Sequence, residues 1–278
     1  MQFSVSSRLS YEVRAQTVFV LNVEAAALRN QKILTEQLDL SPGVALDRYV
    51  LDGGTRLVRA VVEPGTFEVA YTATVELDMH DADPAQVAET PIAQMPLEVM
   101  PFLNPSRYCQ SDMLGRFAQR QFGGLLPGHP RVTAICNWIY EQVDYQSGTS
   151  DSQTSAYDTM VQRAGVCRDF AHLGIAFCRA LGIPARFASA YAWQLDPPDF
   201  HAVFECYLDG AWYIFDPTRK AAIQGLVRIG VGRDAADAAF ATIHGDAQMT
   251  AMSVSIEPVA EDGAVPDTEP TVRAVGIA

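Results

Sequence analysis

A cysteine at the predicted start of a helix is the first residue in this chain whose position suggests chemistry. The helical spacing of Phe170, Leu173 and Phe177 predicts a helix over residues 167–181, with that face in the core. Cys167 then lies in the first turn, where unpaired N–H groups and the helix dipole favour a thiolate. Most unpaired cysteines are inert core residues, so this stretch alone leaves a structural thiol as the alternative.

A predicted β-hairpin further along the chain supplies a histidine and an aspartate. Residues 201–208 alternate like a strand, the Asp-Gly pair at 209–210 is a two-residue hairpin signal, and residues 211–216 form the returning strand. In this register His201 and Asp216 are diagonal neighbours on one face, with backbones roughly 7–8 Å apart. Their side chains are therefore within reach of a hydrogen bond.

Together these residue types form a nucleophile, a base and an orienting group. The imidazole of His201 would take the proton of the Cys167 thiol, and the Asp216 carboxylate would fix the ring's tautomer and stabilise the imidazolium. Glu205 shares the strand face but lies about 13 Å along the strand from His201, too far to be its partner. The alternative is that His201 and Asp216 merely end two strands. Their joint placement with Cys167 favours the catalytic interpretation.

Several spaced runs in this half of the chain carry a family pattern. They are residues 101–109 (PFLNPSRYC), 163–173 (RAGVCRDFAHL), 179–186 (RALGIPAR), 199–205 (DFHAVFE) and 210–217 (GAWYIFDP). These runs cover most of residues 95–245 and resemble the transglutaminase-like superfamily, in the bacterial branch whose members are often named as candidate cysteine proteases.

The resemblance implies a papain-like core with Cys167, His201 and Asp216 as its triad, and an N-terminal β-rich domain. The sequence departs from the family at Ala202-Val203, where many members carry a tryptophan after the histidine. That position should face the core, so the difference concerns packing more than chemistry.

The oxyanion of an acyl-transfer intermediate needs hydrogen-bond donors. The N–H of Cys167 is one, at a helix N-terminus. The resemblance implies a second donor from a side chain upstream of the cysteine, and Tyr145 is the candidate by its place in the chain. A packed tyrosine remains the alternative. We interpret His172 as an internal histidine and His244 as a weak rival to His201.

The order of the predicted strands and helices indicates an α+β fold. We expect an N-terminal antiparallel β-sandwich-like domain, followed by a papain-like/transglutaminase-like core in which helices pack on an antiparallel sheet. The β-favouring segments of the first part are residues 3–13, 16–23, 32–40, 45–51, 55–63 and 67–77. Helices are predicted over residues 111–122, 129–143, 156–164 and 167–181, and strands over 186–193, 201–208, 211–216 and 249–257.

These elements divide the chain into a β-rich domain (1–80), a proline-containing linker (81–97), a catalytic core (98–257) and an acidic flexible tail (258–278). Within the core, residues 234–243 are predicted as a short helix capped by Asp234. Residues 230–233 before it could form a loop at the cleft.

Composition excludes several classes of protein. The net charge is −13, with no basic patch, so nucleic-acid binding is not expected. There is no apolar run of about 18 residues and no signal-peptide pattern, which predicts no membrane partner and a cytoplasmic location. The cysteines other than Cys167 (Cys109, Cys136, Cys178 and Cys206) have no metal-like spacing and are interpreted as structural thiols. No metal or other cofactor is expected.

The hypothesis is a cysteine-dependent acyl transfer on a peptide or protein amide, through a thioester at Cys167. Water as the acceptor makes the enzyme a protease or amidase, and an amine makes it a transglutaminase; the triad does not choose between them. A non-catalytic protein- or peptide-binding module on the same fold is the main alternative, and a peptide-N-glycanase-type amidase is a weaker one. The substrate and the oligomeric state stay open.

Overall fold

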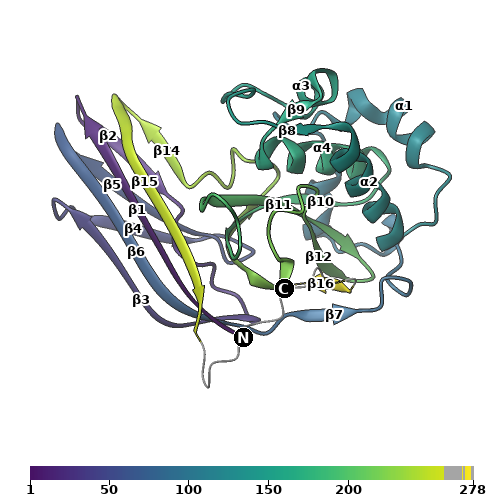
Figure 1. Ribbon diagram of the computed structural model, residues 1–278, viewed down its shortest axis with the longest axis horizontal. Helices are drawn as coiled ribbons and strands as arrows, with labels where there is room; N and C mark the ends of the chain where they lie inside the picture. Colours follow the sequence, from purple (N-terminus) through teal and green to yellow (C-terminus); the bar gives the residue numbers. More distant parts are fainter. Residues whose placement is uncertain (260–270, 272, 277–278) are drawn as a thin grey trace.

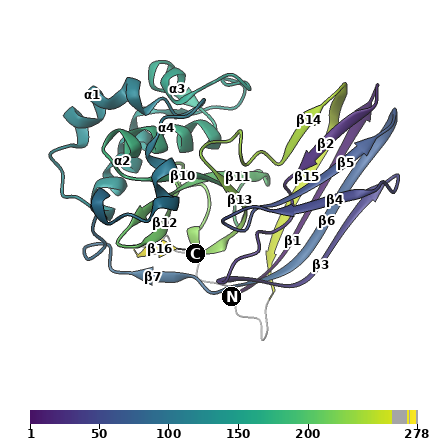
Figure 2. The ribbon, with the colours of Figure 1, turned by 180° about the vertical axis from the view of Figure 1, so that it is seen from behind.

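The computed structural model describes residues 1–259, 271 and 273–276. Two sheets lie on one side of the molecule and the α-helices on the other, with a third, larger sheet between them (Figure 1). The view from behind shows the same arrangement (Figure 2). The molecule thus has a β-domain and an α+β core, as predicted.

The β-domain consists of two four-stranded antiparallel sheets, ordered β15-β1-β6-β3 and β14-β2-β5-β4. The strands from the start of the chain are β1 (Gln2–Val13), β2 (Thr17–Leu21), β3 (Gln31–Ser41), β4 (Leu46–Val50), β5 (Arg56–Val62) and β6 (Gly65–Leu77). Aromatic rings from the two sheets pack against each other. The ring centroid of Phe19, in β2, lies 5.0 Å from that of Tyr11 and 4.8 Å from that of Phe67, both in the other sheet. Alternating apolar residues therefore meet in one core, as expected of a sandwich.

The core contains four α-helices and a six-stranded sheet ordered β13-β10-β11-β12-β16-β7. The helices are α1 (Ser111–Phe122), α2 (His129–Gln142), α3 (Ala156–Gln162) and α4 (Cys167–Ala180). The strands are β7 (His80–Ala82), β10 (Ala185–Ala192), β11 (Phe200–Leu208), β12 (Ala211–Phe215), β13 (Leu226–Gly232) and β16 (Ala274–Gly276). Short 3₁₀ helices are η1 (Ile92–Gln94), η2 (Leu97–Leu103) and η3 (Ile223–Gly225). Among the described helices, none is both long and apolar enough to cross a membrane.

The six-stranded sheet is buried on both faces. On one face, α4 approaches β11 so closely that a Cβ on Gly174 would lie 2.5 Å from the Phe204 ring. On the other face, Val203 and Ile214 pack in the same apolar cluster as the β-domain. The sheet thus couples the helix that carries Cys167 to the first domain.

The chain after β13 differs from the prediction. Residues 234–243 do not form a helix, because the Asp234 carboxylate accepts the N–H groups of Ala236 and Tyr108 and holds a turn. The chain then enters β14 (Ala241–His244), which pairs with β2, and β15 (Ala247–Pro258), which pairs with β1. Residues predicted as the end of the core therefore complete both sheets of the β-domain.

The predicted acidic tail lies largely outside the described residues. Where it is described, at Ala274–Gly276, the chain forms β16 between β12 and β7. Ala274 and Val275 are buried there, so the prediction of a flexible tail is wrong for this segment. Residues 80–82, at the predicted boundary between the β-rich domain (1–80) and the linker (81–97), pair with the same strand.

Candidate active site

The start of α4 exposes one thiol. Cys167 is the first residue of the helix and is partly exposed, whereas the other four cysteines, all within the described residues, are buried. The fully buried Asp169 carboxylate accepts the N–H of Val166 at 2.9 Å and pairs with Arg168 at 3.0 Å. A Cβ on Gly165 would lie 2.7 Å from the Asp169 side chain, so only glycine leaves room for this cap. These contacts fix where the thiol points.

The hairpin of β11 and β12 brings the histidine and the aspartate together. Its register, with Leu208 opposite Ala211 and Glu205 opposite Ile214, is the one predicted from the Asp-Gly turn. His201 Nε2 lies 2.9 Å from Asp216 Oδ2. The predicted diagonal neighbours are therefore hydrogen-bonded.

The second oxygen of Asp216 is held as well. Asp216 Oδ1 accepts the N–H of Thr218 at 2.9 Å and its hydroxyl at 2.7 Å. Glu205, excluded as a partner of His201 by distance, is instead fully buried between Arg186 and Arg228. The carboxylate that orients the imidazole is therefore immobilised by a turn of its own.

Electrostatics favour the charged form of this pair. Burial alone would lower the pKa of His201, but the charge and hydrogen bond of Asp216, with Cys167 adding to them, raise it to about 10. Burial would raise the pKa of Asp216, but His201 and the two hydrogen bonds from Thr218 lower it. His201 Nδ1 is buried and has no hydrogen-bond partner among the described residues. That nitrogen remains available to exchange a proton with the thiol.

Tyr145 lies beside the thiol. It ends β8 (Asp144–Tyr145), which pairs with β9 (Ala164–Gly165), so Tyr145 stands opposite Gly165. Its hydroxyl lies against the backbone N–H and the thiol of Cys167, and burial together with Cys167 raises the pKa of Tyr145 to about 12. Two hydrogen-bond donors, the Cys167 N–H and the Tyr145 hydroxyl, therefore meet at one place.

The other histidines are not part of this site. His172 is fully buried, its Nε2 accepts the N–H of Ala235 at 3.1 Å, and its ring stacks on Tyr108. Burial, followed by the charges of two arginines, lowers the pKa of His172. His244 lies in β14 of the β-domain, paired with Val18. His172 is therefore the internal histidine that was predicted.

Two charged residues near the thiol were not identified from the sequence. Asp199 interacts electrostatically with both His201 and Tyr145, and burial raises its pKa. The ammonium of Lys220 lies 4.3 Å from the centre of the Tyr145 ring. Their closeness in sequence to His201 and Asp216 was the only available signal.

The remaining thiols are enclosed. Cys178 and Cys206 are fully buried with their sulfurs 3.6 Å apart, between α4 and β11. Burial raises the pKa of Cys109 to about 12 and that of Cys136 further above its ordinary value. In the part of the chain that the structure describes, no group of three or more His, Cys, Asp or Glu side chains is arranged to hold a metal.

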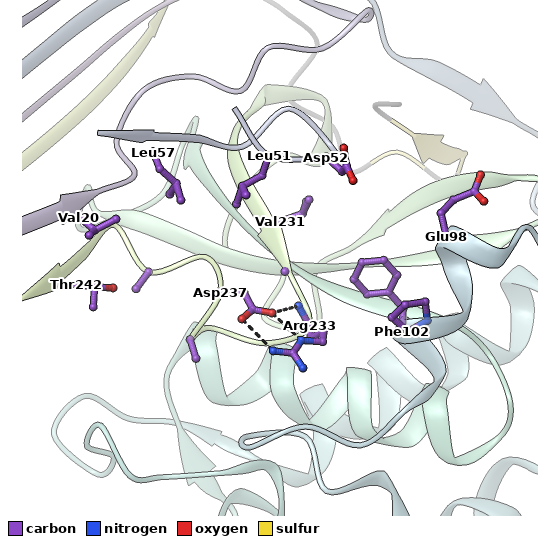
Figure 3. Close-up of a pocket in the computed structure, with 14 residues that line it drawn as sticks. Val20, Leu51, Asp52, Leu57, Glu98, Phe102, Val231, Arg233, Asp237 and Thr242 are labelled. Carbon is purple, nitrogen blue, oxygen red and sulfur yellow. Dashed lines mark hydrogen bonds and ion pairs between the residues drawn. The ribbon is translucent and has the colours of Figure 1, made fainter. Parts of the chain in front are cut away.

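A separate cavity of about 550 Å³ lies between the two domains. It is lined mainly by apolar residues, by the carboxylates of Asp52 and Glu98, and by the ion pair of Arg233 and Asp237 (Figure 3). Residues 231–233 line it, but Gly230–Gly232 belong to β13 rather than to a loop at the cleft. None of Cys167, His201 and Asp216 lines this cavity. It is distinct from the site at the start of α4.

Comparison with known families identifies both domains. The model described as "Bacterial transglutaminase, N-terminal domain" matches residues 1–98, and the core model of the "Transglutaminase-like superfamily" matches residues 115–217. The second match includes Cys167, His201 and Asp216.

Related proteins cover nearly the whole chain. A crystal structure described as a "Putative Cysteine Protease" from Cytophaga hutchinsonii is 44% identical, covers 100% of this chain and 98% of its own, and superposes with a TM-score of 0.94. An uncharacterised protein of Mycobacterium leprae is 26% identical over 247 residues, 80% of this chain and 88% of that one. The chain therefore belongs to the transglutaminase-like superfamily and carries the N-terminal domain of bacterial transglutaminases.

Proposed function

We propose that the protein is a cysteine-dependent acyl-transfer enzyme acting on amides, with Cys167 as nucleophile, His201 as acid–base and Asp216 as orienting carboxylate. The observation that carries the proposal is the 2.9 Å contact between His201 and Asp216, together with the interaction of His201 with the partly exposed thiol of Cys167. A buried histidine whose pKa is raised favours an imidazolium–thiolate pair. The likeness to the Cytophaga hutchinsonii structure supports the same assignment.

The reaction proceeds in two halves. The Cys167 sulfur attacks the amide carbonyl carbon, and the oxyanion is held by the Cys167 N–H and the Tyr145 hydroxyl. When the carbon–nitrogen bond breaks, His201 gives its proton to the leaving amine, and a thioester to Cys167 remains. Water or a second amine then loses a proton to His201, attacks the thioester and restores the thiolate. None of these steps requires a metal or other cofactor.

The thioester is the species to detect. An activated amide or an electrophilic peptide probe should add one acyl or probe mass to the intact protein, mapped to Cys167 by peptide analysis. Cys167→Ala should fold with an unchanged circular dichroism spectrum and acquire no mass. Cys178→Ala is the matched control, because that thiol is fully buried, and it should still be labelled at Cys167. Equal labelling of all five cysteines, or none at Cys167, would leave the protein a binding module on this fold.

Once the thioester is detected, its fate separates the two acceptor classes. Release of ammonia or amine without an added acceptor indicates hydrolysis, and incorporation of a labelled alkylamine indicates transamidation.

A further inference from the structure

Lys220 stands next to the proposed oxyanion site, and the triad carboxylate determines its position. Asp216 Oδ1 accepts the hydroxyl of Thr218, and the Thr218 oxygen in turn accepts the backbone N–H of Lys220 at 3.2 Å. This turn places the Lys220 ammonium 4.3 Å from the centre of the Tyr145 ring. The Tyr145 hydroxyl lies against the N–H of Cys167. One aromatic ring therefore separates the ammonium from the thiol.

Neither Lys220 nor the neighbouring Arg219 forms an ion pair with a carboxylate of the described residues. Within the described residues, Lys220 has no ion pair, and its side-chain partner is the neutral Tyr145 ring. The neighbouring Arg219 likewise has neutral partners, the Tyr140 ring and the Asn137 carbonyl. By contrast, Arg168 beside the thiol is paired with Asp169. Lys220 is only partly buried, so a substrate group can reach it.

The carboxylate of Asp199 is also close to the site and interacts with both His201 and Tyr145. The Asp199 carboxylate accepts the N–H of Phe200 at 2.7 Å and interacts with His201. In the proposed reaction, the carbonyl oxygen lies at Tyr145, and His201 protonates the leaving amine. A group on the acyl part of a substrate that lies beside the Tyr145 ring would therefore meet Lys220.

We propose that Lys220 is a specificity-determining residue that binds a carboxylate on the acyl part of the amide substrate. This inference rests on the proposed function, since it uses the same cleft. A partly exposed ammonium over an aromatic ring keeps unused hydrogen-bond donors, and a carboxylate satisfies them with charge-assisted bonds. The carboxylate belongs to an acidic side chain or to a free chain end, which share this chemistry.

The effect of the Lys220 charge on the reaction of Cys167 with an anion can be measured without knowing the substrate. Iodoacetate and iodoacetamide are nearly equal in size, and both alkylate a thiolate with loss of iodide, but only iodoacetate is an anion. We expect Lys220→Met to lower the ratio of the iodoacetate to the iodoacetamide rate constant at Cys167 by about six- to sixteenfold, the effect of one unit charge roughly 10 Å away at an effective dielectric constant of about 20–30.

Three matched variants accompany this one. Lys220→Arg should keep most of the ratio, Asp199→Asn should raise it, and Lys32→Met, which removes the only other lysine from an exposed site on β3, should leave it unchanged. Added salt should reduce the difference between wild type and Lys220→Met, because exposed charges are screened.

The outcomes separate the two proposals. If Cys167 reacts no faster than the buried cysteines with either reagent, the catalytic assignment fails. If Cys167 is reactive but Lys220→Met leaves the ratio unchanged, or slows both reagents equally, the role of Lys220 as an anion site is overturned. With substrates, kcat/KM for a glutamate-containing peptide amide against its glutamine analogue tests the side-chain carboxylate. A free against an amidated chain end tests the terminal carboxylate.

Discussion

At Asp216, one buried oxygen holds the imidazole of His201 and the other holds the turn at Thr218. Asp216→Asn keeps the shape of the side chain and removes its charge. The amide can present its NH₂ group to His201, which selects the wrong tautomer, and the imidazolium loses its counter-charge. We expect the rate of thioester formation to fall by about 100-fold or more, with the substrate KM changed far less.

The control is Asp237→Asn, which breaks an exposed ion pair with Arg233 away from the thiol and should retain the wild-type rate. A single-turnover measurement with an activated amide checks both variants. Wild-type rates in Asp216→Asn would contradict the assignment of that carboxylate.

The same pair should shape stability as a function of pH. The pKa of His201 is raised from 6.5 to about 10, so its stabilisation is complete below about pH 6.5 and is lost as the pH rises towards 10. The pKa of Asp216 is lowered from 3.8, so its contribution is present above that value and is lost as the pH falls through the folded-state pKa. The pair therefore stabilises most between about pH 4 and 6.5.

Between pH 6.5 and 10 the wild type should lose unfolding free energy at up to about 1.4 kcal/mol per pH unit from this group. His201→Gln should show a flatter profile over that range. Urea unfolding at a series of pH values measures both, and parallel profiles would show that the imidazole titrates normally in the folded protein.

Sequence alone pointed to the three residues of the proposed triad because each is placed by local rules. A helix start places Cys167, and a two-residue turn fixes the register that pairs His201 with Asp216. Lys220 and Asp199 were missed for a physical reason. Each follows or precedes a strand, where neither the period of two nor the helical period assigns a direction to the side chain.

At the scale of elements, the contact between α4 and β11 depends on a glycine. Gly→Ala in a helix ordinarily stabilises by about 0.5–1 kcal/mol. At Gly174, the added Cβ would lie 2.5 Å from the ring of Phe204, which is fully buried, so the ring or the helix would have to shift. Overpacking of this kind costs about 1–3 kcal/mol, so we expect Gly174→Ala to destabilise the protein.

Gly115 of α1 is the matched control. A Cβ there has nothing within 4 Å, so Gly115→Ala should stabilise the protein by about 0.5–1 kcal/mol. Denaturant midpoints at a constant m-value provide the comparison. If both substitutions stabilise the protein, α4 packs on β11 less closely than the 2.5 Å distance between the added Cβ and the Phe204 ring requires.

The pattern of residues predicted the elements better than their partners. The alternating pattern of β15 predicted a strand but not its pairing with β1. Alternation shows which face of a strand is buried, but it does not identify the neighbouring strand. The prediction of a helix at residues 234–243 was wrong because the Asp234 carboxylate accepts the backbone N–H of Tyr108 and holds a turn instead. This contact joins distant parts of the chain and has no local signal in the sequence. The short β16 lacks any periodic signal of its own.

At the scale of the whole molecule, the two domains are joined through buried polar groups. The side chain of Gln31, on β3 of the β-domain, donates to the Arg228 carbonyl at 2.8 Å and accepts the Arg228 N–H at 2.7 Å. Arg228 lies in β13 of the core and pairs with the buried Glu205. Strands β14 and β15 also return from the core to both sheets of the β-domain. The domains should therefore unfold as one cooperative unit.

Gln31→Ala tests this coupling. The substitution removes the acceptor of the buried Arg228 N–H and one of two donors to the Arg228 carbonyl, which keeps the N–H of Ala26, so we expect a loss of about 1–3 kcal/mol of unfolding free energy. Trp138 and Trp212 lie in the core part of the chain, whereas Trp193 packs against Phe3 of β1 with ring centroids 5.9 Å apart. In a Trp193→Phe background, tryptophan fluorescence therefore reports on the domain that carries no Gln31 substitution.

The fluorescence and far-UV circular dichroism midpoints should fall together in Gln31→Ala. Gln37 is an exposed glutamine on the same strand and serves as the control. The unfolding free energy of Gln37→Ala should stay within about 0.5 kcal/mol of the wild-type value by both signals. A fluorescence midpoint that does not move while the circular dichroism signal of the β-strands shifts would mean that the core folds without its partner. The β-domain would then be an independent module rather than part of one cooperative unit with the core.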